Sequence, residues 1–127
     1  MTEVVMDASA VIAQLRGEPG ADQVVGQLRG AYLSAVNLAE IAQRLINDGA
    51  SDAAALETLD DLPCEVVPLD EPMAIRAGLM RRSTPRRGLS IGDRACLALA
   101  EKMGLPVLTA DRAWADLDLG VEIVLIR

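Results

Sequence analysis

The chain has 127 residues, a hydrophobic fraction of 51% and a formal net charge of −7, which together indicate one ordered globular domain spanning residues 1–127. It has no histidine, which excludes Ser-His and Cys-His catalytic arrangements and most zinc sites. No apolar run approaches the roughly 18 residues that a membrane helix requires. No signal-peptide pattern follows Met1, so we expect a cytoplasmic protein.

Short apolar segments alternate with segments of helical periodicity along the whole chain. In chain order the pattern predicts a strand at 3–6, a helix from 8 that stops at Gly17, a helix at 21–30, a strand at 31–35, helices at 36–49 and 52–62, a strand at 64–69, helices at 70–82 and 90–104, a strand at 106–110, a short helical turn at 111–118 and a strand at 121–126. Strands separated by helices indicate a mainly parallel sheet with helices on both faces. The sequence therefore predicts a three-layer α/β/α sandwich, a class whose sites lie beyond the carboxyl ends of the strands.

Four acidic residues stand near the starts of predicted helices, where each has an ordinary structural explanation. Asp7 and Asp111 follow predicted strands, and Asp is among the side chains most favoured for capping a helix. Asp93 completes the S-x-x-D pattern of a capping box that begins at Ser90. Glu40 is expected in the first turn of its helix, where the helix dipole favours an acidic side chain. Its other ordinary explanation is a solvated surface charge. Projection along the helix places Glu40 on one polar face with Gln43, Arg44 and Asn47.

The four acids together favour a shared site. In a parallel sheet every strand-to-helix turn opens at the same edge, so four carboxylates face one crevice if their strands are neighbours. Adjacent carboxylates raise one another's pKa or require a cation. Oxygen ligands without histidine point to Mg²⁺ or Mn²⁺, which can clamp and polarise a phosphodiester and lower the pKa of an attacking water. Strand order is not readable from sequence, so capping and a metal-dependent phosphodiesterase site both remain open at this point.

The segments that carry these acids also carry a family resemblance. In order along the chain, "MDASA", "SAVNLAE", "GLSIGDRACLALA" and "VLTADRAW" resemble the PIN-domain nucleases, and above all the VapC-type toxins of bacterial toxin–antitoxin pairs. "EPGA" after the first helix and the closing "VEIVLIR" fit the same pattern. The resemblance covers nearly the whole chain, and four motifs in the right order and spacing are far more specific than any one of them.

The resemblance implies a Mg²⁺- or Mn²⁺-dependent endoribonuclease in which a metal-activated water hydrolyses RNA. Asp7, Glu40, Asp93 and Asp111 match the acidic quartet of the family. Asp116 matches a further position that is acidic in many members and is expected as an additional metal ligand. The hydroxyl positions of the family correspond to Thr109 and Ser9, which would orient a carboxylate or a water; both are also explained as ordinary caps or strand-end residues.

Arginines are the predicted contacts for RNA or for an antitoxin. Removing the five proposed site acids from the formal charge of −7 leaves −2, so a metal-neutralised pocket accounts for much of the acidity. The cluster Arg81, Arg82, Arg86 and Arg87 is the main candidate, with Arg94 and Arg112 as lesser ones. The alternatives are a solvated loop for the cluster and, for Arg112, an ion pair with Asp111 or Asp116.

The resemblance also implies partners. We expect an RNA substrate, a cognate VapB-type antitoxin that occupies the acidic groove, and a homodimer held by the apolar faces of the helices at 21–30 and 52–59, which are equally suited to covering the sheet. DNA is expected to be bound only indirectly, through the antitoxin.

Two other functions remain open on the sequence alone. A receiver-like phosphoacceptor domain also gathers acids at strand ends, but it requires a lysine at the end of a late strand, and the only lysine, Lys102, falls within a predicted helix. A non-catalytic binding module that retains the PIN-like fold is the second alternative, and metal binding distinguishes it from a nuclease.

Overall fold

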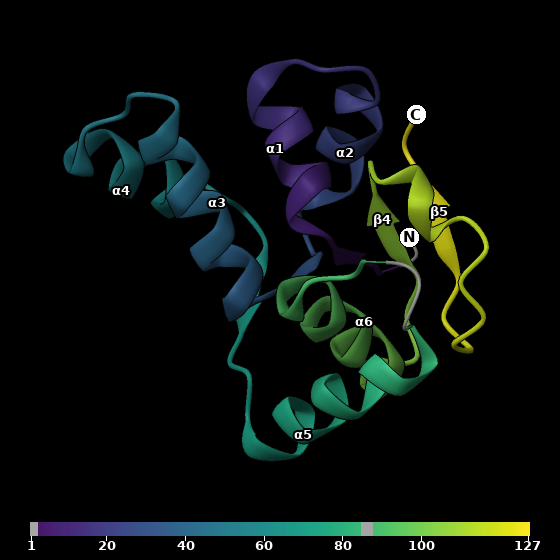
Figure 1. The fold of residues 1–127 in the computed structure, drawn as a ribbon. Helices are drawn as coiled ribbons and strands as arrows, with labels where there is room; N and C mark the ends of the chain where they lie inside the picture. Colours follow the sequence, from purple (N-terminus) through teal and green to yellow (C-terminus); the bar gives the residue numbers. More distant parts are fainter. Residues whose placement is uncertain (1–2, 85–87) are drawn as a thin grey trace.

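A computed structural model describes residues 3–84 and 88–127 of the chain. These residues form the following elements in chain order (Figure 1): β1 (Val5–Met6), α1 (Ala8–Arg16), α2 (Ala21–Leu28), β2 (Tyr32–Ser34), α3 (Ala35–Asn47), α4 (Asp52–Asp60), β3 (Glu65–Val67), α5 (Glu71–Leu79), the 3-10 helix η1 (Met80–Ser83), α6 (Ile91–Met103), β4 (Val107–Thr109), the 3-10 helix η2 (Arg112–Trp114) and β5 (Ile123–Leu125).

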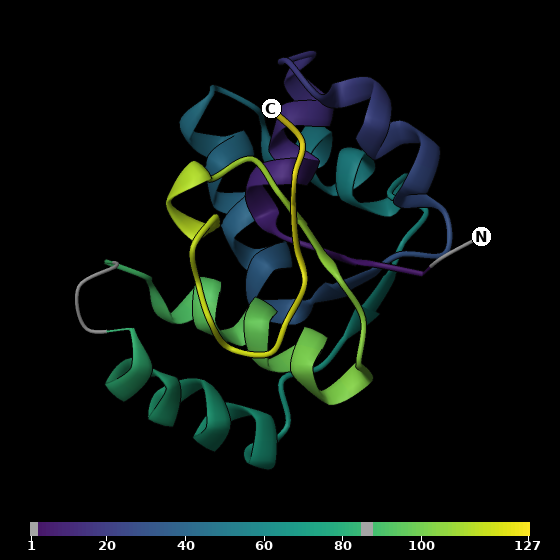
Figure 2. The same ribbon diagram turned by 90° about the vertical axis from the view of Figure 1, so that its right-hand side faces the viewer.

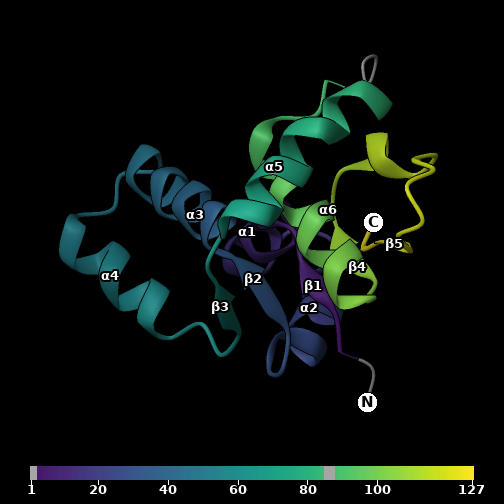
Figure 3. The same cartoon turned by 90° about the horizontal axis from the view of Figure 1, so that it is seen from below.

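The five strands form one parallel sheet in the order β3-β2-β1-β4-β5, which Figure 3 shows from below. Val5 pairs with Tyr32 on one side of β1 and with Val107 on the other. The chain therefore builds outward from β1 in one direction through β2 and β3, and then returns to the other side of β1 for β4 and β5. The change of direction lies between β1 and β4, and such a switch point opens a crevice at the carboxyl ends of the two strands.

Helices cover both faces of the sheet, as the sequence predicts. Side chains alternate across β1, so Val4 and Met6 join the core beneath α1, α2 and α3, whereas Val5 joins the core beneath α5 and α6. Figure 2 shows α5 and α6 together on one side of the sheet and α1 and α2 on the other. The predicted three-layer α/β/α architecture is confirmed.

Two details differ from the sequence prediction. The helix expected at 70–82 ends at Leu79 and tightens into η1, where the guanidinium of Arg94 donates to the carbonyls of Ala77 and Gly78 and satisfies the end of α5. The strand expected at 64–69 lies at the edge of the sheet, and its Glu65 and Val66 are exposed. Only strands with neighbours on both sides are fully enclosed by the helical layers.

The two cysteines, Cys64 and Cys96, are both free. Within residues 3–84 and 88–127, no helix has the length and apolar character needed to cross a bilayer.

Candidate active site

A cavity of about 440 Å³ lies at the carboxyl ends of β1 and β4, where the sheet changes direction. All four acids singled out in the sequence line it: Asp7, Glu40, Asp93 and Asp111. Asp7 follows β1 directly, and Asp111 lies two residues after β4. Pairing of β1 with β4 therefore brings together two carboxylates that are more than a hundred residues apart in the chain.

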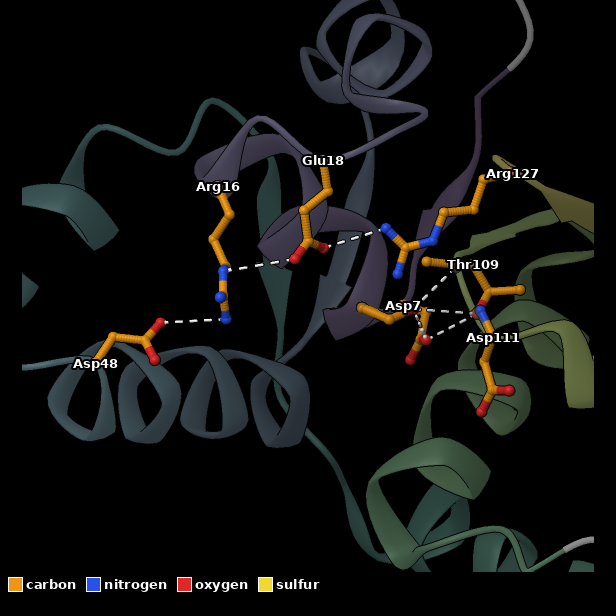
Figure 4. A network of polar contacts seen from close by, with 9 residues as sticks. Asp7, Arg16, Glu18, Asp48, Thr109, Asp111 and Arg127 are labelled. Atoms are coloured by element: carbon orange, nitrogen blue, oxygen red, sulfur yellow. Dashed lines mark hydrogen bonds and ion pairs between the residues drawn. The ribbon is translucent and has the colours of Figure 1, made fainter.

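Asp7 is held by two hydroxyl groups. Its carboxylate is buried, and its Oδ2 accepts hydrogen bonds from Ser9 Oγ at 2.5 Å and Thr109 Oγ1 at 2.9 Å. Each hydroxyl in turn accepts a backbone N–H, from Ala110 for Ser9 and from Asp111 for Thr109. Figure 4 shows Asp7, Thr109 and Asp111 gathered at this strand end. Asp7 occupies the N-cap position of α1, but its side chain makes no capping hydrogen bond, so capping does not explain this carboxylate.

Burial makes the ionised form of Asp7 costly. It raises the pKa of Asp7 from 3.8 to about 6, with smaller contributions from the charges of Asp93 and Glu40, and the hydrogen bonds from Ser9 and Thr109 act in the opposite direction. A buried carboxylate near other carboxylates that remains at a cavity wall is typical of a functional site.

Glu40 reaches the cavity from the second turn of α3. The helix begins at Ala35, one residue before the sequence predicts, so the expectation that Glu40 lies in the first turn is wrong. It is also not a free surface charge, because its Oε1 accepts a hydrogen bond from Asn37 Nδ2 at 2.7 Å. The same amide donates to the carbonyl of Gly92 at 3.1 Å and so ties α3 to the start of α6.

Gly92 leaves the space that the Glu40 carboxylate fills. A Cβ at this position would lie 2.5 Å from Cδ, Oε1 and Oε2 of Glu40, well inside van der Waals contact. Asn37 and Gly92 thus position Glu40, although neither belongs to the residues predicted for the site. An Asn three residues before an acid, on the otherwise apolar face of a helix, was the available signal for Asn37.

Asp93 and Asp111 combine helix capping with exposure to the cavity. Ser90 and Asp93 form the predicted capping box, with Asp93 Oδ2 accepting from the Ser90 N–H at 2.9 Å. Asp111 caps η2 as predicted, through Oδ1 and the N–H of Ala113 at 2.9 Å. Burial also raises the pKa of Asp93.

The four carboxylates share one pattern of hydrogen bonding. Within the described residues, each accepts protein hydrogen bonds on a single oxygen, and its second oxygen accepts none. The protein therefore fixes each side chain through one oxygen and leaves the other available. This oxygen-only donor set fits a hard divalent cation such as Mg²⁺ or Mn²⁺.

The acids do not form a closed cage. Across residues 3–84 and 88–127, no three Asp, Glu or Cys side chains converge on one point as the ligands of a preformed metal site do. Mg²⁺ commonly keeps several waters and takes only one or two protein carboxylates together with substrate phosphates. An open arrangement of this kind therefore suits a cation that is shared with a phosphodiester.

Comparison with known proteins identifies the family. The PIN-domain model matches residues 4–119 of the chain. The chain belongs to the PIN-domain family. Among curated protein sequences, none matches it.

Solved structures of similar fold include several from toxin–antitoxin complexes. A chain of a toxin–antitoxin complex from Klebsiella pneumoniae superimposes with a TM-score of 0.78 at 17% identity, covering 98% of both chains. A chain of DNA-bound VapBC from Salmonella typhimurium gives 0.76 at 18% identity, covering 100% of both. A member of the VapBC family from Mycobacterium tuberculosis gives 0.69 at 29% identity, covering 98% of this PIN domain and 99% of that chain. The resemblance stated from the motifs is confirmed.

The remaining predicted residues lie elsewhere on the PIN domain. Asp116 is exposed beyond η2 and is not among the described residues that line the cavity. Arg81 and Arg82 are exposed on η1, away from the cavity lining, and Arg86 and Arg87 lie outside the described residues. The predicted contact of this cluster with RNA or antitoxin stays a prediction.

Two further arginines have partners in the protein. Arg94 caps the end of α5 instead of facing the cavity. Arg112 donates from Nε to the backbone oxygen of Arg127 at 3.3 Å, and its ion pair with Asp111 or Asp116 stays a prediction.

The receiver-like alternative is not supported. Lys102 lies on α6 and pairs with Asp70 at 3.3 Å, and the described cavity lining does not include it. Family membership and the position of this lysine both count against a phosphoacceptor site.

Proposed function

We propose that this PIN domain is a Mg²⁺- or Mn²⁺-dependent endoribonuclease and the toxin of a VapBC-type toxin–antitoxin pair. The observation that carries the proposal is the set of four carboxylates that line one cavity, each of which accepts hydrogen bonds from the described residues on one oxygen only. Membership of the PIN family and the similarity to chains from VapBC complexes support the same function.

The residues divide into ligands and groups that hold them. Asp7, Glu40, Asp93 and Asp111 would hold the metal. Such a cation neutralises phosphate charge and lowers the pKa of an attacking water.

The groups that hold the ligands act on Asp7 and Glu40. Ser9 and Thr109 orient Asp7 by donating to its Oδ2. Asn37 holds Glu40 in the space left by Gly92. Asp116 remains a less direct candidate, because it stands outside the described lining of the cavity.

The proposed partners follow from the same similarity. A VapB-type antitoxin would restrain the nuclease by occupying the acidic cavity, and DNA would be reached only through it. For the homodimer, the sequence points to α2 and α4. A second groove of about 440 Å³ lies between these helices, lined in part by Val25, Leu28 and Leu62, which is compatible with a surface covered by another copy.

The test is cleavage of RNA by matched variants. We expect Mn²⁺-dependent cleavage of total RNA by the wild type, and its loss by at least about a hundredfold in Asp93→Asn and Glu40→Gln, because each removes a ligand charge. Glu101→Gln is the control, since Glu101 is an exposed acid of α6 paired with Arg76 away from the cavity.

Three results would contradict the proposal. Undiminished cleavage by Asp93→Asn or Glu40→Gln would remove the assignment of the site. Cleavage that persists in EDTA would contradict the proposed metal dependence. A wild type that neither binds Mn²⁺ in calorimetry nor cleaves RNA would instead favour a non-catalytic binding module.

A further inference from the structure

One wall of the cavity carries basic and amide groups beside the acids. Glu40, Gln43, Arg44 and Asn47 of α3 all line the cavity, at the spacing that places them on one face of a helix. Arg44 stands one turn beyond Glu40, so its Cα lies about 6 Å further along the helix axis. Arg127, which follows β5, lines the same cavity from another element.

These two arginines are the ends of a chain of ion pairs around the rim. Arg44 pairs with Asp48 at 3.5 Å, Asp48 with Arg16 at 3.5 Å, Arg16 with Glu18 at 3.5 Å, and Glu18 with Arg127 at 3.1 Å. Figure 4 shows the part of this chain from Asp48 through Arg16 and Glu18 to Arg127, which ends close to Asp7 and Thr109.

The ion pairs of the rim are weak enough to exchange partners. All the side chains in the chain are 32–45% exposed, and exposed pairs of this kind contribute little to stability because water and salt screen them. A phosphate offers a guanidinium two acceptor oxygens in a geometry that matches its donors. A nucleic-acid phosphate can therefore replace Glu18 or Asp48 as the partner of the adjacent arginine without disturbing the fold.

A substrate strand also requires positive charge at this position. The acids on the cavity wall repel a polyanion, and a cation among them neutralises only the phosphate that it contacts. Within the described lining of the cavity, Arg44 and Arg127 are the basic side chains. The exposed arginines of η1 do not line the cavity.

We propose that Arg44 and Arg127 bind the phosphates of the RNA strand on either side of the acids. Glu18 and Asp48 hold these guanidinium groups at the rim until the strand displaces them. The proposal rests on the nuclease function proposed above and assigns the residues that hold its substrate.

The test compares rim variants with a matched pair elsewhere. Arg76 and Glu101 form an equally exposed ion pair, at 2.7 Å, between α5 and α6. Arg44→Gln, Arg127→Gln and Glu18→Gln are therefore compared with Arg76→Gln and Glu101→Gln. Binding of a short fluorescein-labelled single-stranded RNA of mixed sequence is measured by anisotropy at several salt concentrations in the Asp93→Asn background. Cleavage kinetics are measured separately in the otherwise wild-type chain.

Substitution of the two partners of one ion pair should change RNA affinity in opposite directions. Arg44→Gln and Arg127→Gln each weaken RNA binding about tenfold, as expected for a lost charged hydrogen bond, and each lowers the slope of log affinity against log salt by about 0.7. Glu18→Gln strengthens binding by up to about fivefold, because it releases Arg127 from its competitor. In cleavage, the arginine variants raise KM and leave kcat nearly unchanged.

Loss of folding cannot imitate this pattern, since no unfolded variant binds more tightly than its parent. The rim assignment is overturned if the arginine variants match Arg76→Gln in affinity, salt slope and KM, or if Glu18→Gln weakens binding. Failure of the nuclease function is distinguishable, because it appears as absence of cleavage in the wild type, whereas the binding comparison does not depend on turnover.

Discussion

At the scale of single residues, burial of the Asp7 carboxylate has a large free-energy cost. It is 3% exposed, and its pKa is raised to about 6, chiefly by burial. A buried carboxylate whose hydrogen bonds do not compensate for its desolvation destabilises the fold when it ionises. Helix capping does not offset this destabilisation, because the Asp7 side chain does not cap α1. We therefore attribute the carboxylate at this position to the proposed metal site and predict that it lowers stability while supporting activity.

Asp7→Asn should stabilise the protein at neutral pH. The folded pKa of about 6 exceeds the ordinary 3.8, so between these values the native chain retains a proton that the unfolded chain has released, and stability falls as the pH rises. Above pH 6 the full cost applies, about 3 kcal/mol for a shift of this size. Thermal unfolding in EDTA from pH 4 to pH 8 should show this decline in the wild type and a clearly smaller one in Asp7→Asn, which removes the charge and retains a side-chain oxygen for Ser9 and Thr109.

The exposed Asp22 of α2 provides the matched substitution. Asp22→Asn should unfold like the wild type across the same pH range. A variant Asp7→Asn that is less stable than the wild type at pH 7.5, or that declines equally with pH, would contradict the burial argument.

Gly92→Ala should separate activity from stability. A methyl group at this position overlaps the Glu40 carboxylate at 2.5 Å. Because the atoms in conflict end a flexible side chain, Glu40 swings away and the backbone stays. Ala is favoured over Gly in a helix by up to about 1 kcal/mol, so the thermal midpoint should hold or rise. RNA cleavage should fall by about 10- to 100-fold, as for other groups that orient a ligand.

Gly78→Ala tests whether that loss is specific. Gly78 also lies within a helix, α5, and an added Cβ meets nothing within 4 Å. It should show the same or a greater gain in stability with full cleavage. Equal cleavage by both alanine variants would show that the position of Glu40 does not matter.

At the scale of elements, the start of α6 serves the fold and the site with the same atoms. The capping box fixes Asp93 through Oδ2, and no described residue donates to its other oxygen. α4 begins with a comparable cap, in which Ser51 Oγ accepts the N–H of Ala54 at 3.1 Å. No residue of α4 is among the described residues that line the cavity. Substitution of each serine therefore separates the loss of a helix cap from a disturbance of the site.

Ser90→Ala and Ser51→Ala should cost the same stability and differ in activity. Each removes one N-cap hydroxyl, at a cost of about 1 kcal/mol. Ser90→Ala should also lower cleavage severalfold, since the Asp93 backbone N–H loses its acceptor Ser90 Oγ and the turn that carries the Asp93 carboxylate is then held only by the N–H of residue 90. Chemical denaturation measures the first effect and initial rates the second. A loss of activity in Ser51→Ala as large as in Ser90→Ala would mean that general destabilisation explains both.

Local signals made the elements and their caps predictable. Serine and aspartate at the starts of periodic apolar segments predicted the caps at Ser90 and Asp111, and the structure confirms them. The assignment of Glu40 to a first turn was wrong by one turn, because Ala35 can extend a helix backward as readily as Val36 can start it. Asn37 and Gly92 escaped notice because their importance depends on contact between α3 and α6, which no local pattern encodes.

At the scale of the molecule, strand order decides whether the acids meet. The motifs placed the four carboxylates at helix starts, but only the order β3-β2-β1-β4-β5 sets β4 beside β1 and brings Asp111 to Asp7. That order results from packing of the helices on both faces, which involves residues distant in sequence. Topology therefore concentrates acids at one edge of a chain whose net charge is −7, and like charges held there raise the energy of the folded state.

Divalent cations should therefore stabilise the folded protein through this edge. A ligand that binds only the native state adds about 2.7 kcal/mol when its concentration is a hundred times its dissociation constant, which for a domain of this size corresponds to a rise in Tm of about 10 °C. We expect this rise with MnCl₂ at pH 7.5 and a much smaller one in Asp93→Asn, whereas Glu101→Gln should respond like the wild type because Glu101 lies outside the cavity lining. NaCl at equal ionic strength separates binding from screening, since screening relieves repulsion without a site. If NaCl reproduces the rise in Tm, or Asp93→Asn retains it in full, the acids act only through mutual repulsion and the proposed metal site is contradicted.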